Sequence, residues 1–134
     1  MKLKESLDNV LDYEMQYMGM GYKYTFNLKE EFNINLKIIV NILVDDYEMF
    51  VNFKADGPDN ELSTEKKASF AIFATLVEIL DEASRKQKIV TIQGIGDTFK
   101  KGLIYEKLFK RFIPENWEVN RTGTAAIAQK KSKL

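Results

Sequence analysis

The sequence contains no cysteine and no histidine. Without cysteine the chain has no disulfide bond, no thiol nucleophile and no zinc–thiolate site. Without histidine it has no imidazole base, so a serine or cysteine triad of the usual kind cannot be formed. A general base in this chain would therefore have to be a carboxylate, a lysine or a tyrosine.

Long apolar segments are also absent. No stretch approaches the ~18 consecutive apolar residues with which a helix crosses a membrane. The N-terminal segment carries Lys2, Lys4 and Glu5 where a signal peptide has an apolar block. The sequence therefore predicts an intracellular, cytoplasmic protein without a membrane partner.

The residues that are present suit one ordinary globular domain. The chain has 134 residues, of which 45% are apolar and 12% aromatic. This length is sufficient to bury a single hydrophobic core without disulfide or metal crosslinks. We therefore expect a single domain over residues 1–134.

Positive and negative charges balance overall but not along the chain. Residues 1–65 contain thirteen acidic and six basic side chains, whereas residues 66–134 contain seven acidic and fourteen basic ones. A fold that separates these halves has a basic face that suits phosphates, nucleic acid or an acidic protein surface. In a fold where the halves interdigitate the two fields cancel, and this is the arrangement that we favour.

The chain begins with a pattern typical of an amphipathic helix. Apolar residues recur at helical spacing, with charged residues between them, at Leu3, Leu7, Val10, Leu11, Met15 and Met18. The pattern predicts a helix over residues 1–18, which ends before Gly19.

Three strands are expected next. Apolar and polar residues alternate over residues 22–28, 34–44 and 47–53, and Asp45 and Asp46 are typical of a tight turn between the last two segments. Together these segments predict an antiparallel meander with one buried face.

Helices and strands alternate in the second half. The sequence predicts a buried helix through residues 70–80, a strand over residues 88–93, a basic helix over residues 100–112 and a final hairpin over residues 117–128. The first of these helices connects two strands as a crossover, which predicts a parallel strand pair. We expect residues 129–134 to form a flexible basic tail.

This order of elements resembles the GNAT superfamily of acetyl-CoA-dependent N-acetyltransferases, and in particular the small GNAT-like proteins that bacteriophages encode. The matching segments are the Phe-rich helix from Phe70, the apolar strand from Ile89 and the segment from Lys101 to Arg111. The resemblance covers residues 20–128. It implies an α+β fold with a mixed, mostly antiparallel sheet and helices packed on its faces.

The resemblance also implies roles for individual residues. In acetyltransferases of this kind a tyrosine of the last helix protonates the departing thiolate of coenzyme A, and Tyr105 matches that position. Thr98 lies near the position of an asparagine that contacts the cofactor's pantetheine arm. An acyltransferase would need a base as well, for which Glu48 acting through water is a candidate, with a backbone N–H of the sheet as oxyanion donor.

The loop after the third strand departs from the family. Relatives bind the cofactor's pyrophosphate with a loop of the form Arg/Gln-x-x-Gly-x-Gly/Ala, whose backbone N–H groups approach the phosphates. From residue 54 to residue 65 this chain has one glycine, one proline and four acids, Asp56, Asp59, Glu61 and Glu65. Each carboxylate repels a phosphate by about 1 kcal/mol at a surface dielectric. We therefore expect no cofactor, and acetyl-CoA only with an atypical loop.

The basic helix supplies a candidate interaction surface, made of Lys100, Lys101, Lys107, Lys110 and Arg111. Nucleic acid is a less favoured partner than protein, because Tyr105 and Phe109 fall on the apolar stripe of this helix and not among its cations. We expect no metal site, since adjacent acids at a turn such as Asp45 and Asp46 are usually solvated.

Three functional hypotheses follow. The first is a non-catalytic GNAT-like protein-interaction domain, encoded by a phage, that acts on a host protein in the host cytoplasm or is a component of the virion. The second is an N-acetyltransferase that uses acetyl-CoA with Tyr105 as its acid. The third is nucleic-acid binding through the basic helix, for which affinity would fall steeply with salt.

Overall fold

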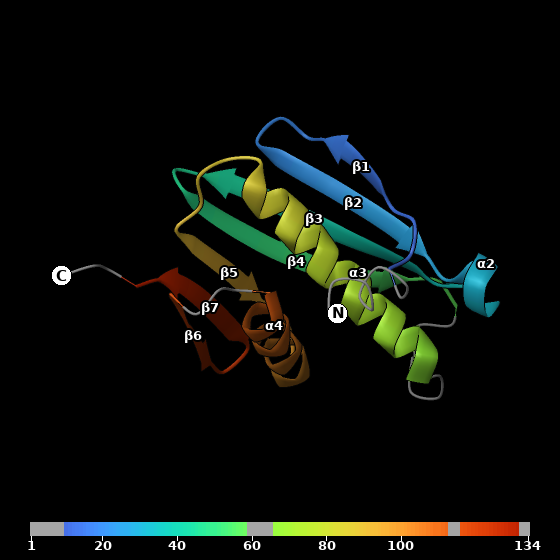
Figure 1. Ribbon diagram of the computed structural model, residues 1–134. Helices are drawn as coiled ribbons and strands as arrows, with labels where there is room; N and C mark the ends of the chain where they lie inside the picture. The colour runs from blue at the N-terminus through green and yellow to red at the C-terminus, as the bar shows by residue number, and fades with distance from the viewer. Residues whose placement is uncertain (1–9, 59–65, 113–115, 132–134) are drawn as a thin grey trace.

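The computed structural model describes residues 10–58, 66–112 and 116–131. Within these ranges seven strands form one mixed sheet, accompanied by three helices (Figure 1). The strands are β1 Glu14–Tyr17, β2 Gly21–Asn27, β3 Lys37–Asp45, β4 Glu48–Asp56, β5 Thr91–Ile95, β6 Trp117–Thr122 and β7 Ala125–Lys130. The helices are α2 Lys29–Phe32, α3 Lys66–Arg85 and α4 Phe99–Phe112. The expected α+β class is confirmed.

The strands lie in the order β1-β2-β3-β4-β5-β7-β6. Neighbouring strands are antiparallel except for β4 and β5, which pair in parallel. Since α3 connects β4 to β5, the predicted crossover and its parallel pair are confirmed. The predicted final hairpin is confirmed as β6 and β7, which turn at Gly123 with φ 61°.

The antiparallel meander is confirmed, with small shifts at its ends. Tyr22, Tyr24 and Phe26 alternate with polar residues in β2 and are buried, and the same holds for alternate residues of β3. The turn between β3 and β4 lies one residue later than expected, because Asp46 and Tyr47 take the positive φ values of 49° and 70°. The expected second strand starts only at Lys37, and the short helix α2 precedes it.

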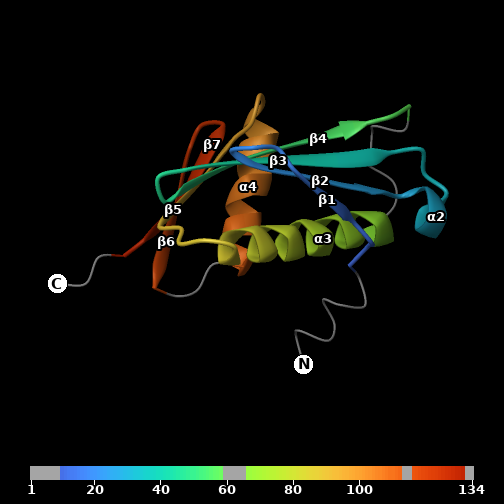
Figure 2. The ribbon, with the colours of Figure 1, turned by 90° about the horizontal axis from the view of Figure 1, so that it is seen from above.

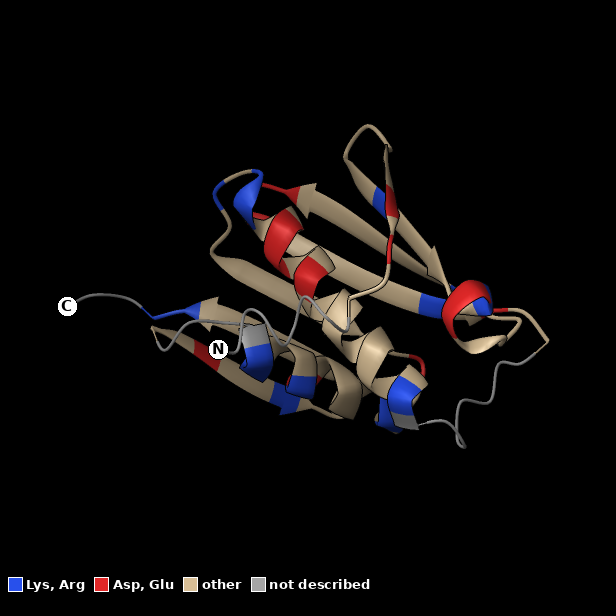
Figure 3. Ribbon diagram, turned by 45° about the vertical axis from the view of Figure 1, so that its right-hand side comes forward, with Lys and Arg blue, Asp and Glu red and all other residues tan. Residues whose placement is uncertain are grey.

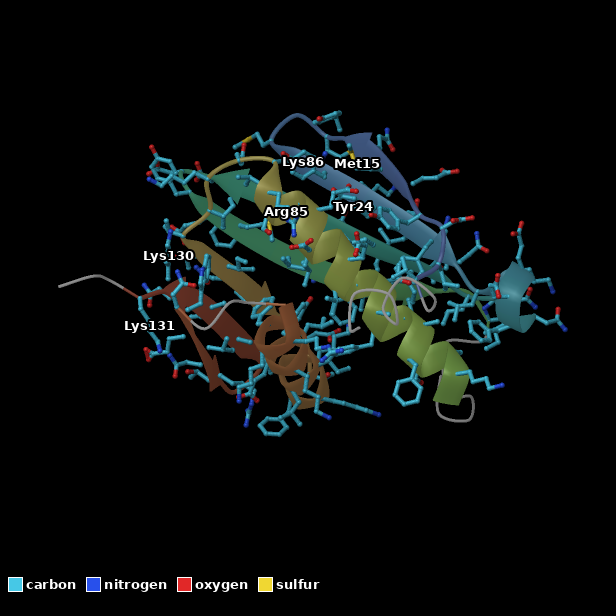
Figure 4. All side chains as sticks on the ribbon, in the orientation of Figure 1. Met15, Tyr24, Arg85, Lys86, Lys130 and Lys131 are labelled. Atoms are coloured by element: carbon cyan, nitrogen blue, oxygen red, sulfur yellow. The ribbon has the colours of Figure 1, made fainter. Side chains whose placement is uncertain are left out.

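The predicted opening helix is wrong over residues 10–18, where the chain has no helix and forms the edge strand β1 at Glu14–Tyr17. The cause is a pattern that fits both periods, because Tyr13, Met15 and Tyr17 also recur at every second residue. Met15 stands opposite Tyr24 of β2 in the antiparallel register, and Figure 4 shows the two side chains beside each other. The first nine residues of the predicted helix lie outside the described ranges.

The predicted flexible tail is wrong at its start. Gln129 and Lys130 belong to β7, where Gln129 pairs with both Thr91 and Glu118. The N–H of Lys130 donates to the carbonyl of Val90 at 2.9 Å. These residues are therefore ordered by strand pairing on both sides, and residues 132–134 lie outside the described ranges.

Both long helices pack on the same face of the sheet. Tyr24 of β2 lies opposite Val40 of β3, which lies opposite Phe53 of β4, so their side chains share one face. The Tyr24 hydroxyl donates to Glu82 of α3, and the Phe53 ring packs on Tyr105 of α4. Figure 2 shows α3 running below β2, β3 and β4. The main core lies between this face and the two helices.

The two oppositely charged halves of the sequence lie side by side in the sheet. The strands β1 to β4 come from the acidic first half, and β5, β7 and β6 come from the basic second half. Figure 3 shows acidic residues on α2 and basic residues along α4. The expected interdigitation of the halves is therefore wrong for the strands, although α3 of the second half lies under strands of the first.

Within the described ranges, no helix has both the length and the apolar composition needed to cross a membrane.

Candidate functional site

The sheet parts between β4 and β5. Their pairing runs from Glu48 to Val51 on β4 and from Thr91 to Gly94 on β5, but β4 continues to Asp56. Backbone groups on this side of β4 beyond Val51 therefore lack a strand partner and need another one. The partner of the Phe53 N–H is Tyr105, whose hydroxyl oxygen accepts its hydrogen bond at 3.1 Å.

The ring of Tyr105 fills the space that this divergence opens. Its side chain is 0% exposed, and its ring meets those of Phe53 and Phe109 with centroids 4.8 Å and 6.1 Å away. Gly94 of β5 makes room for it, because a Cβ on that glycine would lie 2.5 Å from Cδ1 of the tyrosine. Any larger residue at position 94 would displace Tyr105.

The surroundings of Tyr105 keep its phenol protonated. Burial raises its pKa, and the negative charge of Asp97 raises it as well, whereas the hydrogen bond from the Phe53 N–H lowers it. The net pKa lies above the ordinary tyrosine value. The hydroxyl is therefore neutral at physiological pH, but it is enclosed by the core.

Thr98 caps α4. Its Oγ1 accepts a hydrogen bond from the N–H of Lys101 at 3.2 Å, as an N-cap residue does. The carboxylate of Asp97 forms an ion pair with Lys101 at 3.3 Å. Its negative charge also lies near the positive end of the helix dipole, which is favourable. Thr98 is exposed, whereas Tyr105 lies two turns further along the helix and is buried. The structure therefore gives Thr98 a structural role and does not bring it together with Tyr105.

Glu48, the candidate base, lies on the other face of the sheet from Tyr105. Along β4 the side chains of Met49, Val51 and Phe53 point toward the helices, so that of Glu48 points away from them. Its carboxylate accepts a hydrogen bond from the Gln93 side chain at 3.1 Å. The sheet thus separates the acid and base of the acyltransferase hypothesis, and in this respect the sequence-based pairing is wrong.

The five cations of α4 differ in their surroundings. Lys101 pairs with Asp97, and Lys110 pairs with Glu106 at 3.3 Å. Lys100, Lys107 and Arg111 are exposed and form no ion pair with another described residue. These three recur at intervals of seven and four residues, which places them on one stripe of the helix. This stripe is the part of the predicted surface whose cations have no ion-pair partner among the described residues.

Glu106 ties α4 to the last hairpin. It accepts a hydrogen bond from Nε of Arg121 on β6 at 3.1 Å in addition to its ion pair with Lys110. Partial desolvation acts to raise the pKa of Glu106, but the hydrogen bonds from Arg121 and Lys110 outweigh it, so the pKa lies below its usual value. This network orients α4, and with it the basic stripe, against β6.

A second polar cluster, which the sequence did not reveal, joins the β1–β2 hairpin to α3. The carboxylate oxygens of Glu82 accept hydrogen bonds from the hydroxyls of Tyr13 and Tyr24 at 2.9 Å and 2.8 Å. Burial, and then the bond to Glu82, raise the pKa of both phenols. The available signal was Glu82 itself, an acid three residues after the buried Ile79 on the apolar stripe of α3.

No group of three or more acidic side chains in the described residues is arranged to hold a metal ion. A polar groove of about 850 Å3 lies between the segment before β1, α2 and the start of α3. Acidic residues of the first half, Asp12, Glu14, Glu30 and Glu31, line it together with Lys37 and Lys67. Tyr105 and the basic stripe are not among its lining residues.

A comparison with protein-family models and with curated proteins finds no match to this chain.

Proposed function

We propose that this chain is a non-catalytic GNAT-like domain that binds another protein. The observation that supports this proposal is the state of Tyr105, whose hydroxyl is buried and holds the backbone N–H of Phe53. A general acid must reach a leaving group, and this phenol reaches the sheet backbone instead. The order of elements from β2 to β7, on which the resemblance rests, supports the GNAT-like part of the proposal.

The loop after β4 supports a function without a cofactor. Its glycine, Gly57, has φ 142°, and a Cβ there would lie 2.4 Å from the carbonyl oxygen of Asn35. The glycine thus allows two backbone segments to cross, which by itself explains its presence. Asp56 is exposed beside it, and its carboxylate would repel a phosphate by about 1 kcal/mol. The acids at positions 59, 61 and 65 lie outside the described ranges.

The basic stripe of α4 is the surface that we propose for the partner. Lys100, Lys107 and Arg111 project from one side of a helix that Glu106 and Arg121 fix to the sheet. Such a stripe fits an acidic protein surface and speeds encounter with it. The partner we propose is a host protein in the bacterial cytoplasm, or a virion component, if the chain is phage-encoded as its resemblance implies.

Calorimetry with acetyl-CoA tests the absence of a cofactor directly. We expect no binding at micromolar concentrations, and binding in that range would contradict the proposal.

Pull-down from a host lysate tests the surface, with Lys100, Lys107 and Arg111 changed together to Glu. A matched control changes Lys86, Lys130 and Lys131 together to Glu; they lie away from α4, just past the end of α3 and at the end of β7 (Figure 4). A partner lost only from the first variant supports the basic stripe, and equal capture by both variants contradicts it.

The acyltransferase is retained as a second candidate because of one observation. The Phe53 N–H, which has no strand partner, and the protonated Tyr105 that accepts its hydrogen bond meet where β4 and β5 part. These are an oxyanion donor and an acid of the type that acyl transfer from a thioester requires. In this candidate Tyr105 leaves the Phe53 N–H and protonates the thiolate of coenzyme A. Kinetics of Tyr105→Phe with acetyl-CoA and an amine tests it, and unchanged turnover would exclude the role of Tyr105.

The structure offers less support to nucleic-acid binding through α4. Tyr105 and Phe109 are both buried in the core, as expected from their place on the apolar stripe. They cannot stack on bases while the domain is folded.

A further inference from the structure

The face of the sheet opposite α3 and α4 is not covered by any described helix. Leu43 and Phe50 lie opposite each other on this face, next in sequence to the buried Ile42 and Val51. Leu43 is 47% exposed, and Ile95 of β5 is 57% exposed. A groove of about 390 Å3 runs past these side chains and Gly21. We call these residues and their polar neighbours on the same face the open face.

Charges at the two ends of the open face have opposite signs. The register of β3 and β4 places four pairs on it in succession, Asp45–Glu48, Leu43–Phe50, Asn41–Asn52 and Ile39–Lys54. The first pair is acidic, the middle two are uncharged, and the last contains a lysine. Lys23 of β2 lies beside Asn41, in the third of these rows and next to the row of Lys54.

Two further acids lie toward the basic end. Asp56 stands opposite Lys37 in the register, so these two charges offset each other. Glu14 lies on the edge strand β1, opposite Thr25. The half of the open face beyond Val51 therefore carries Lys23, Lys37 and Lys54 against Glu14 and Asp56, a net charge of +1. Glu118 of β6, opposite Gln129, adds a third acid to the other half.

We infer that the open face binds a second copy of this chain, with the two sheets packed face to face about a two-fold axis perpendicular to the strands. Such an axis lies in the interface and reverses the strand direction, so the acidic end of one copy meets the basic end of the other. With the axis at Val51, Glu48 of each copy lies over Lys54 of the other. Packed sheets of this kind are about 10 Å apart, with strands aligned to within about 30°.

The order of the charges points to a second copy and not to an unrelated partner. A face that is acidic, then uncharged, then basic is complementary to itself after this rotation. The dimer then contains two equivalent contacts between an acidic end and a basic end. A two-fold axis parallel to the strands would bring Glu48 onto the acidic end of the other copy, which like-charge repulsion disfavours. The uncharged middle, with Leu43 and Phe50, becomes the centre that is removed from water. This inference does not depend on the proposed function.

Sedimentation equilibrium of the full chain at low salt tests the inference. We expect a reversible dimer, and Leu43→Glu should raise its Kd by about a hundredfold, because it buries a carboxylate at the centre. The matched control is Phe70→Glu on α3, whose side chain is 67% exposed on the other side of the molecule. It should leave the Kd unchanged.

A charge exchange separates the proposed pairing from a general effect on folding. Lys54→Glu alone should raise the Kd by about tenfold, and adding Glu48→Lys should return it to within about threefold of the wild type. Circular dichroism establishes that each variant is folded. A wild-type chain that is monomeric at about 100 µM would overturn the inference, as would a double variant no tighter than Lys54→Glu. Weakening by Phe70→Glu equal to that by Leu43→Glu would do the same.

Discussion

The two faces of the sheet differ in what their side chains contact. On the covered face, Tyr24 of β2 and Tyr105 and Phe109 of α4 are fully buried. The hydroxyls of both tyrosines have a hydrogen-bond partner. On the open face, Leu43 and Ile95 are about half exposed among asparagines and charged residues. One sheet therefore has a face built as a core and a face built as a surface.

This difference shows which residues hold the fold and which are available for recognition. Tyr105, the acid proposed from the sequence, lies on the covered face, where its hydroxyl accepts from a backbone N–H at the divergence of β4 and β5. Glu48, the proposed base, lies on the open face. The exposed apolar side chains that we propose for recognition, in contrast, lie on the open face. The cations without an ion-pair partner among the described residues lie on the basic stripe of α4. Changes on the covered face should alter stability, and changes elsewhere should alter association.

Adjacent residues of β3 give the most direct test of this difference. Ile42 is 2% exposed on the covered face, whereas Leu43 is 47% exposed on the open face. Ile42→Ala should reduce the free energy of unfolding by about 4 kcal/mol, through lost burial and a cavity. Leu43→Ala should reduce it by about 1 kcal/mol or less. Urea unfolding of dilute protein measures both, and similar losses for the two variants would contradict the assignment of the faces.

The Glu82 cluster tests whether polar contacts on the covered face matter as much as apolar ones. Glu82→Leu removes the acceptor of two phenols, Tyr13 and Tyr24, and should cost about 3 kcal/mol because the buried hydroxyl of Tyr24 is left without a partner. Glu78→Leu, one turn earlier on α3, is the matched control and should change stability by about 0.5 kcal/mol or less. If both variants unfold at the same urea concentration, the cluster has no special role in stability.

Most of the covered face could be predicted from the sequence. The alternation in β2 and β3 and the apolar stripe of α4 identify residues that the structure buries, because a core face repeats with the period of its element. In α3 the expected burial is confirmed for Leu76 and Leu80 but is wrong for Phe70, which is 67% exposed. The β4–β5 crossover followed from the order of elements in the same way. The residues of β1 were harder to predict, since Met15 fits both the helical spacing of Leu11 and Met18 and the strand alternation of Tyr13 and Tyr17.

The candidate site was less predictable, because it depends on contacts between distant segments. That Tyr105 would meet the Phe53 N–H required the extent of β4–β5 pairing, which no local pattern contains. The alternation along β4 already places Glu48 on the side opposite to Met49 and Phe53. That Tyr105 would pack on the Phe53 side could not be read from it. The open face also escaped sequence analysis, since its alternate residues in β3 include Ile39 and Leu43 and thus do not read as a solvent face.

Alkaline pH should lower the free energy of unfolding through the tyrosines of the covered face. Burial raises the pKa of Tyr13, Tyr24 and Tyr105 in the folded state, so these phenols stay protonated while those of the unfolded chain ionise near pH 10. The unfolded state then binds fewer protons, so this stabilisation is complete below about pH 10 and falls as the pH rises further. The loss is at most about 1.4 kcal/mol per pH unit for each tyrosine, and less where solvent screens Tyr13.

Unfolding free energies between about pH 9 and pH 11 measure this slope. Tyr24→Phe should make the slope less steep than in the wild type, because one phenol with a raised pKa is removed. A slope equal to that of the wild type would show that the covered face does not hold Tyr24 in the protonated state.

The smallest expected effect concerns Thr98, which lies at the exposed start of α4 and belongs to neither face. Thr98→Ala removes the hydroxyl that accepts from the N–H of Lys101 and should cost about 1 kcal/mol of stability. Thr98→Ser keeps an acceptor at the same place and should restore most of this loss. Because the cap acts on the helix end alone, neither variant should change the dimer Kd proposed for the open face. A Kd altered by Thr98→Ala but not by Thr98→Ser would mean that α4 and the open face are coupled through the sheet, and that the two faces are not independent.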